Sequence, residues 1–250
     1  MKKVLHSVDE AGKIANLKLN AKKTKVMHIN GKESPPDIQV NNTSLEYVKH
    51  FKYLGSVKTN DGTCLQDIKT RIAMTKQKMV QLTNIWKDRG IPVPLKLKIL
   101  KCLIWPVLLY GCEAWTLRKE EADKLRAAEM WLYRRLLRVS WKDKRTNESI
   151  LTELSLERQI IHEIDRRRLR YIGHANRSTS TNLMSTVLMG KVEAKRRKGR
   201  PPINYIENVV KTSGLSGIQE LMHLSRERET WRDLVTSHGA PNVDDGEGAR

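Results

Sequence analysis

The stretch LQDIKTRIAMTKQKMVQLTNIW, residues 65–86, predicts that much of this chain is helical. Its apolar residues recur at alternating steps of three and four, which places them in one stripe along a helix. The stripe consists of Leu65, Ile68, Ile72, Thr75, Met79, Leu82 and Trp86. Basic side chains occupy the opposite side, so the segment is expected to bury one face and expose the other.

Helical patterns continue along the rest of the chain. Residues 95–115 are apolar on nearly every side, which predicts a buried helix that bends or ends at Pro106, because proline lacks an amide N–H. Residues 119–139 carry another apolar stripe, with Trp131 and several arginines on an adjoining arc. Shorter helices are predicted for residues 147–154, 157–172, 203–212 and 218–236.

The segment before residue 65 has a different character. The strings IQV (38–40), SLEYV (44–48) and FKYLG (51–55) follow a Gly- and Pro-containing turn at 31–37, and predict short strands of a small antiparallel sheet. The NDG string at 60–62 is typical of a hairpin turn. The expected fold class is therefore α+β, mostly α, with a small antiparallel sheet followed by a helical bundle and further helices.

The charge balance favours a polyanionic partner. The 250 residues include 47 Lys and Arg against 28 Asp and Glu, a net charge of +19. Nucleic acid is the leading candidate, and an anionic membrane surface is the rival. The longest apolar stretch, 102–112, is too short to span a bilayer, so no membrane partner is expected. Residues 1–13 lack the apolar core of a secretory signal, which favours a reducing compartment.

Metal and disulfide sites are not expected. Cys64, Cys102 and Cys112 are widely spaced without a CxxC pair, so buried free thiols are predicted rather than disulfides or a thiolate zinc site. The seven histidines are scattered and fit no common metal-binding spacing.

Five longer strings follow one another along the chain: LNAKKTKVM (19–27), FKYLG (51–55), LLYGCEAWTL (108–117), RRRLRYIGHANR (166–177) and KGRPP (198–202). This order resembles the C-terminal part of the non-LTR (LINE-type) retrotransposon reverse transcriptases, and the resemblance covers nearly all of residues 1–236.

The resemblance implies a domain order. Residues 1–62 correspond to the end of the polymerase palm with its primer-grip turn, residues 65–145 to a helical thumb, and residues 146–236 to a basic post-thumb region. Residues 237–250 have no apolar periodicity and are expected to be disordered.

The resemblance also implies an activity for the intact relatives, which copy RNA into DNA with magnesium held by paired carboxylates. This chain shows no such carboxylate pair, so no catalytic residue and no cofactor of its own is assigned. It is expected to bind RNA or template–primer duplex and to be inactive alone as an RNA-directed DNA polymerase.

The resemblance carries two sets of nucleotide- and primer-binding residues. Asn20, Lys23 and Thr24 match the motif beside the incoming triphosphate, with Lys23 as the contact. The primer-grip turn is matched by Phe51, Tyr53, Leu54 and Gly55, and Gly55 suits a tight bend because it tolerates positive φ. Spacing alone favours a solvated basic turn for residues 22–25, and it fits an amphipathic strand for residues 51–55 equally well.

Nucleic-acid contacts are predicted for basic residues on the later helices and the linker that follows them. They are Arg134, Arg135, Arg138, Arg166, Arg167, Arg168, Arg170, Lys195, Arg196, Arg197, Lys198 and Arg200. Such contacts neutralise phosphates and are sensitive to salt. Trp131 either stacks on a base or lies over the stems of its own arginines.

The string KRRKGRPP (195–202) has three interpretations: a nuclear localisation signal, an extended segment for a narrow minor groove, or a solvated linker. The first places the protein in the nucleus, or in a cytoplasmic ribonucleoprotein before import. A different class of function is a domesticated nuclear adaptor whose helices bind protein. A third possibility is an open reading frame without a role, whose product would tend to aggregate.

Overall fold

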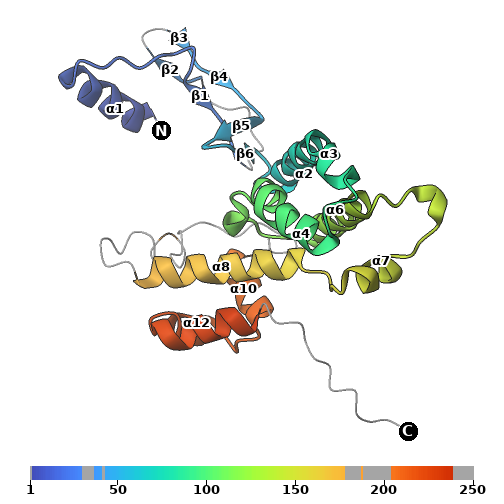
Figure 1. Ribbon diagram of the computed structural model, residues 1–250. Coiled ribbons are helices and arrows are strands. Elements are labelled where there is room, and N and C mark those ends of the chain that lie inside the picture. The colour runs from blue at the N-terminus through green and yellow to red at the C-terminus, as the bar shows by residue number, and fades with distance from the viewer. Residues whose placement is uncertain (1, 30–36, 41–42, 178–186, 188–203, 239–250) are drawn as a thin grey trace. The chain divides into compact units, whose positions relative to one another are not determined.

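The computed structural model describes residues 2–29, 37–40, 43–177, 187 and 204–238 (Figure 1). The chain divides into two compact units, Met1–Asp67 and Ile68–Arg250. Most described elements are helices, and the strands form three two-stranded sheets, which confirms the mostly α, α+β fold class. The boundary between the units falls near the start of a helix, and the further boundary predicted at 145–146 stays a prediction.

Helix α1 (Lys2–Ile14) and short strands make up most of the described part of the first unit. Strand β1 (Lys25–Val26) pairs with β4 (Glu46–Tyr47), and β2 (Gln39–Val40) pairs with β3 (Thr43–Ser44). The β2–β3 pair is antiparallel as predicted, whereas β1–β4 is parallel. A small core joins these segments, made of Ile38, Val40 and Leu45 with Leu5, Leu19, Ala21 and Val26 packed around it.

The FKYLG string forms the tip of a hairpin. Strand β5 (His50–Tyr53) is antiparallel to β6 (Ser56–Thr59), and Tyr53 lies opposite Ser56. The two connecting residues, Leu54 and Gly55, have φ of 46° and 81°. Positive φ at both positions is the signature of a type I′ turn, whose twist matches that of the strands. The bend predicted at Gly55 is confirmed.

The NDG string does not join two strands, so that prediction is wrong. The carboxylate of Asp61 accepts hydrogen bonds from the Thr59 hydroxyl (2.5 Å) and the Thr63 amide (2.9 Å), and Gly62 has a φ of 69°. These hydrogen bonds hold the pKa of Asp61 below its usual range. The turn instead ends β6 and leads the chain into α2 (Leu65–Gln81).

The helix predicted for residues 65–86 is divided in two at Leu82. Helix α2 ends at Gln81, and α3 (Thr83–Lys87) follows. The indole of Trp86 donates to the Met79 carbonyl across the break (2.9 Å). The buried ammonium of Lys96 then donates to the carbonyls of Trp86 (3.1 Å) and Asp88 (2.6 Å). These contacts satisfy carbonyls that the end of a helix leaves without partners.

Pro106 changes the helix before it. Helix α4 (Val93–Ile99) continues as a π-helical turn (Leu100–Ile104) into α5 (Trp105–Leu108). A proline clashes with the carbonyl four residues back, and widening the helix to i→i−5 hydrogen bonds relieves that clash. The Trp105 amide accordingly donates to the Leu100 carbonyl. The helix predicted for residues 95–115, bent or ended at Pro106, ends two residues after that proline, at Leu108.

Helix α6 (Lys119–Leu137) confirms the helix predicted for residues 119–139. It packs against α3, α4, α7 (Asn147–Leu154) and α8 (Ile160–Arg177). Figure 1 shows α7 following the loop after α6, and α8 running beside α10 and α12.

The last described helices pack on α8. They are α10 (Tyr205–Ser213), α11 (Ile218–Leu224) and α12 (Arg228–Ser237), so the single helix predicted for 218–236 is two. Their common core contains Leu169, Ile172, Ile206, Val209, Leu221, Trp231 and Val235. Most of the tail predicted to be disordered, residues 239–250, lies outside the described residues.

Candidate nucleic-acid interface

Asn20, Lys23 and Thr24 lie together in one turn. The Asn20 side-chain oxygen accepts from the amides of Lys22 (3.0 Å) and Lys23 (3.2 Å), and the Thr24 hydroxyl donates to the Asn20 carbonyl (2.9 Å). Asn20 and Thr24 therefore shape the turn, while the Lys23 side chain is exposed on it. The geometry suits both interpretations, a basic turn and a triphosphate contact.

The hairpin tip exposes apolar side chains. Phe51 is 38% exposed, Tyr53 59% and Leu54 77%. All four residues of β5 are exposed. The four predicted primer-grip residues are thus brought together at one turn, and the side chains of Phe51, Tyr53 and Leu54 are accessible to a partner.

The arginines of α8 are largely occupied within the protein. Arg166 and Arg167 both form ion pairs with Glu163, one turn earlier on the same helix. Arg168 is 1% exposed and donates to Asp165 (3.0 Å) and Asn208 (2.7 Å). Burial raises the pKa of Asp165 although Arg168 opposes the shift.

Arg168 therefore has no surface left for a phosphate, and its burial argues against the predicted contact. Its guanidinium lies over the Tyr205 ring (5.1 Å to the centroid), and the Tyr205 hydroxyl donates to the Glu113 carbonyl (2.7 Å). Burial raises the pKa of Tyr205 to about 12. Arg170 remains exposed on α8.

The GHANR string within 173–177 has a packing role. A Cβ on Gly173 would lie 2.1 Å from the Trp231 indole nitrogen, which itself donates to the Leu169 carbonyl (3.1 Å). The Asn176 amide donates to the Met222 carbonyl (3.0 Å), and Arg177 donates to the Ser225 carbonyl (2.6 Å). This string joins α8 to α11 and α12.

The last turn of α6 and the loop after it differ, because four of their basic side chains are exposed. Arg135, Arg138, Lys142 and Lys144 are exposed, and within the described residues none of them forms an ion pair. Arg138 makes one long hydrogen bond to the Lys87 carbonyl (3.5 Å). Of the predicted contacts here, Arg134 is the exception, since it donates to the Arg145 carbonyl (2.8 Å) and to Asn147 (3.1 Å).

The two tryptophans of this region have different surroundings. Trp131 is half-buried, with the Lys76 ammonium 5.4 Å from its ring centroid. It lines an open pocket of about 440 Å³ together with Asp123, Arg126, Ala127, Met130, Arg134, Asn147 and Arg158. Trp141, which the sequence analysis did not select, is 85% exposed. The sequence feature that could have identified Trp141 is its position between two polar residues, Ser140 and Lys142, outside any apolar stripe.

Several predicted features lie outside the described residues or do not form a site. Lys195, Arg196, Arg197, Lys198 and Arg200 are among the residues not described.

Cys112 is buried and burial raises the pKa of its thiol to about 12, whereas Cys102 is exposed, so the expectation of buried thiols is wrong there. Across the described ranges, no cluster of three His, Cys, Asp or Glu side chains could hold a metal ion. No described helix is long and apolar enough to cross a membrane.

Comparison with known proteins links the chain to a mobile element. It is 22% identical over 248 residues to an uncharacterized transposon-derived protein of Caenorhabditis elegans, and the match covers 93% of this chain and 88% of that protein. No protein-family profile matches the chain, and no solved structure matches it. The similarity indicates a transposon origin.

Proposed function

We propose that this chain is the C-terminal part of a non-LTR retrotransposon reverse transcriptase and that it binds RNA or template–primer duplex through basic helices. Three kinds of observation support the proposal: the order of the sequence strings, the similarity to a transposon-derived protein, and the exposed basic residues at the end of α6 and in the loop after it. The last of these carries most weight for binding, because exposed guanidinium and ammonium groups without ion-pair partners are available to phosphates.

The proposed function is binding, and no catalytic residue is assigned to this chain. Helix α6 and the loop after it would contact phosphates through Arg135, Arg138, Lys142 and Lys144. The Leu54–Gly55 hairpin would face the primer end, and Lys23 a triphosphate. Magnesium would belong to carboxylates of the intact polymerase, and the nucleus would be the site of action.

The test is a titration of a fluorescent RNA–DNA hybrid duplex with the full chain at several salt concentrations. If the four exposed residues each neutralise one phosphate, log K falls with log[salt] at a slope of about −3 to −4. The double substitution Arg135→Gln with Arg138→Gln should reduce that slope by about 2, because two contacts are lost.

A matched control removes the same charge elsewhere. Arg228 and Arg232 are exposed on α12, and Arg228→Gln with Arg232→Gln should leave the slope nearly unchanged. Affinity that is absent at micromolar protein, or that does not depend on salt, would contradict the proposal and favour a protein-binding adaptor. Extension of the primer with nucleotides and magnesium would show that the chain polymerises by itself, and would contradict the assignment of binding alone.

A further inference from the structure

The loop between α6 and α7, residues 138–146, holds Trp141 on a fixed backbone; we call it the tryptophan loop. It begins at Arg138, which ends α6 in the left-handed conformation (φ 61°), and turns again at Lys144 (φ 47°). Between them the Ser140 amide donates to the Asp143 carboxylate (2.6 Å), and the Lys142 amide donates to the Ser140 hydroxyl (3.3 Å). These reciprocal contacts fix a single helical turn around Trp141.

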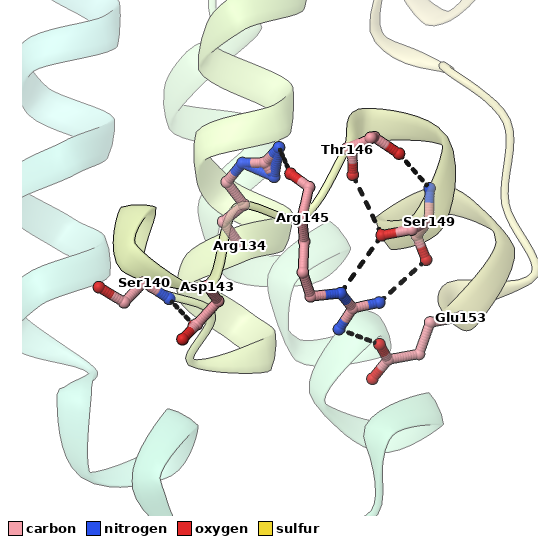
Figure 2. A network of polar contacts seen from close by, with 7 residues as sticks. All are labelled: Arg134, Ser140, Asp143, Arg145, Thr146, Ser149 and Glu153. Carbon is pink, nitrogen blue, oxygen red and sulfur yellow. Dashed lines mark hydrogen bonds and ion pairs between the residues drawn. The ribbon is translucent and has the colours of Figure 1, made fainter.

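The far end of the loop is fixed by a second group of contacts (Figure 2). Arg145 donates to the hydroxyl (3.2 Å) and the carbonyl (3.1 Å) of Ser149 and forms an ion pair with Glu153. The Thr146 hydroxyl accepts from the Ser149 amide (3.1 Å), and Arg134 donates from α6 to the Arg145 carbonyl (2.8 Å). The tryptophan loop is therefore attached to both helices that it connects.

Trp141 has no packing role that explains this fixed loop. Its side chain is 85% exposed, whereas Trp86, Trp105, Trp115 and Trp231 are at most 7% exposed. An indole left in water forgoes the free energy that burial of its large apolar surface would give. A rigid loop that presents such a side chain indicates a contact with another molecule.

The charged residues of the tryptophan loop and of the end of α6 indicate which kind of molecule Trp141 contacts. Arg135, Arg138, Lys142 and Lys144 are exposed on α6 and the loop, and the Asp143 carboxylate already accepts from the backbone. Positive charge next to an exposed aromatic ring is the combination that binds single-stranded nucleic acid: cations bind the backbone and the ring stacks on a base. A protein partner with an apolar pocket would not need four exposed cations in this loop and at the end of the helix before it.

We propose that Trp141 stacks on an unpaired base at the end of a duplex, while the exposed cations of the tryptophan loop and of the end of α6 bind the phosphates of the same strand. This inference rests on the proposed nucleic-acid function and adds a specific substrate feature, the single-stranded overhang. Every base has a stacking face, so the contact tolerates any sequence. Because the loop is already ordered, little conformational entropy is lost when the base binds.

The experiment compares the full chain with its Trp141→Ala and Trp141→Phe variants on three labelled duplexes. One duplex has blunt ends, one has a short single-stranded overhang, and one has the same overhang with abasic sites. The unmodified chain should bind the overhang about 5–100-fold more tightly than the blunt duplex, as expected for one stacked base. Trp141→Ala should remove this preference, Trp141→Phe should keep part of it, and neither should alter binding to the blunt or abasic duplex.

The outcomes separate the two proposals. Equal, salt-dependent binding of all three duplexes that Trp141→Ala does not change would overturn the stacking contact and leave the proposed function intact. No binding to any duplex would overturn both. A Trp141→Ala variant that changes the mass of the protein in sedimentation, without changing the overhang preference, would show that the ring contacts a second copy of this chain instead of a base. Because Trp141 is exposed, its removal should not change the melting temperature, which serves as the folding control.

Discussion

Three arginines of α8 (166–168) and two at the end of α6 (Arg135 and Arg138) look alike in the sequence but have opposite surroundings. Arg166, Arg167 and Arg168 are held by carboxylates of their own helix, and Arg168 is buried. Arg135 and Arg138, in contrast, are exposed and unpaired by any described carboxylate. A run of positive charge therefore does not by itself mark a binding face, because neighbouring acids can use that charge for folding.

The largest difference in stability between the two regions is expected when one arginine in each is replaced by methionine. Arg168→Met leaves the half-buried Asp165 without its counter-charge and should lower the free energy of unfolding by about 3–5 kcal/mol. Arg135→Met should change it by less than about 0.5 kcal/mol, since the side chain is exposed. Urea denaturation of both variants measures this.

A double variant tests whether the unpaired charge of Asp165 causes the loss of stability. Adding Asp165→Asn to Arg168→Met removes the buried charge and should restore part of the lost stability. If Arg168→Met is as stable as the unmodified chain, Arg168 is not the packed residue described above. The α8 arginines would then be candidates for nucleic acid again.

The packing role of the α8 region can also be tested through Gly173. Gly173→Ala places a Cβ against the Trp231 indole, and should cost about 3 kcal/mol because the indole is buried and cannot move without disturbing the core around it. Gly217→Ala is the control, since nothing lies within 4 Å of its Cβ and its φ of 179° is ordinary extended backbone. Thermal melting compares them, and equal melting temperatures would contradict close packing at Gly173.

Glu129 of α6 forms hydrogen bonds to the start of α8, and its ionisation makes the stability of this contact depend on pH. Its carboxylate accepts from the Gln159 amide (2.8 Å), the Ile160 amide (3.1 Å) and the Tyr133 hydroxyl (3.0 Å). Glu129→Ala should cost about 2–3 kcal/mol, because these buried donors lose their acceptor.

The sign of the pH effect follows from the direction of the pKa shift. Burial raises the pKa of Glu129 in the folded chain, so its contribution to stability is fully present below the unfolded pKa, near 4.5, and is lost as the pH rises through the folded value. Glu129→Gln keeps an acceptor oxygen but does not ionise. Its free energy of unfolding should therefore increase relative to the unmodified chain between pH 5 and pH 8, as measured by urea denaturation. The opposite trend would mean that the carboxylate is favoured in its charged form.

A small stabilising effect is expected at the C-terminal end of α7, the helix that follows the tryptophan loop. Ser155 ends this helix in the left-handed conformation (φ 50°) and is exposed. Ser155→Gly should stabilise the protein by about 0.5–1 kcal/mol, because glycine adopts positive φ without steric cost. Binding of the hybrid duplex should not change. A loss of stability would show that the serine side chain matters more than its backbone strain.

The sequence predicted the parts of the fold that depend on local patterns. The apolar stripe of α6 and the Leu54–Gly55 bend are such patterns, because spacing and a glycine determine them within a few residues. The π-helical turn before Pro106 was not predicted, since the proline could have bent, widened or ended the helix. The break at Leu82 depends on side-chain contacts of Trp86 and Lys96, seven and ten residues from their partners, which the apolar spacing does not indicate.

The candidate site was predictable only in part. The pairing of Arg166 and Arg167 with Glu163 could have been recognised from their spacing of three and four residues on a helix. The burial of Arg168 depends on Asn208 and Tyr205, forty and thirty-seven residues later, and no spacing rule indicates it. The exposure of Trp141 depends equally on the fold, because a tryptophan is buried more often than not.

The hydrogen bond between Tyr205 and the Glu113 carbonyl joins positions 92 residues apart. During synthesis on the ribosome, α6 and α8 are complete long before Tyr205 emerges, so they must wait for α10 and α12 with the apolar side of α8 exposed. During this interval the nascent chain exposes apolar surface that favours aggregation and binding by chaperones. A ribosome that stalls before residue 205 would leave a product that lacks the partners of α8.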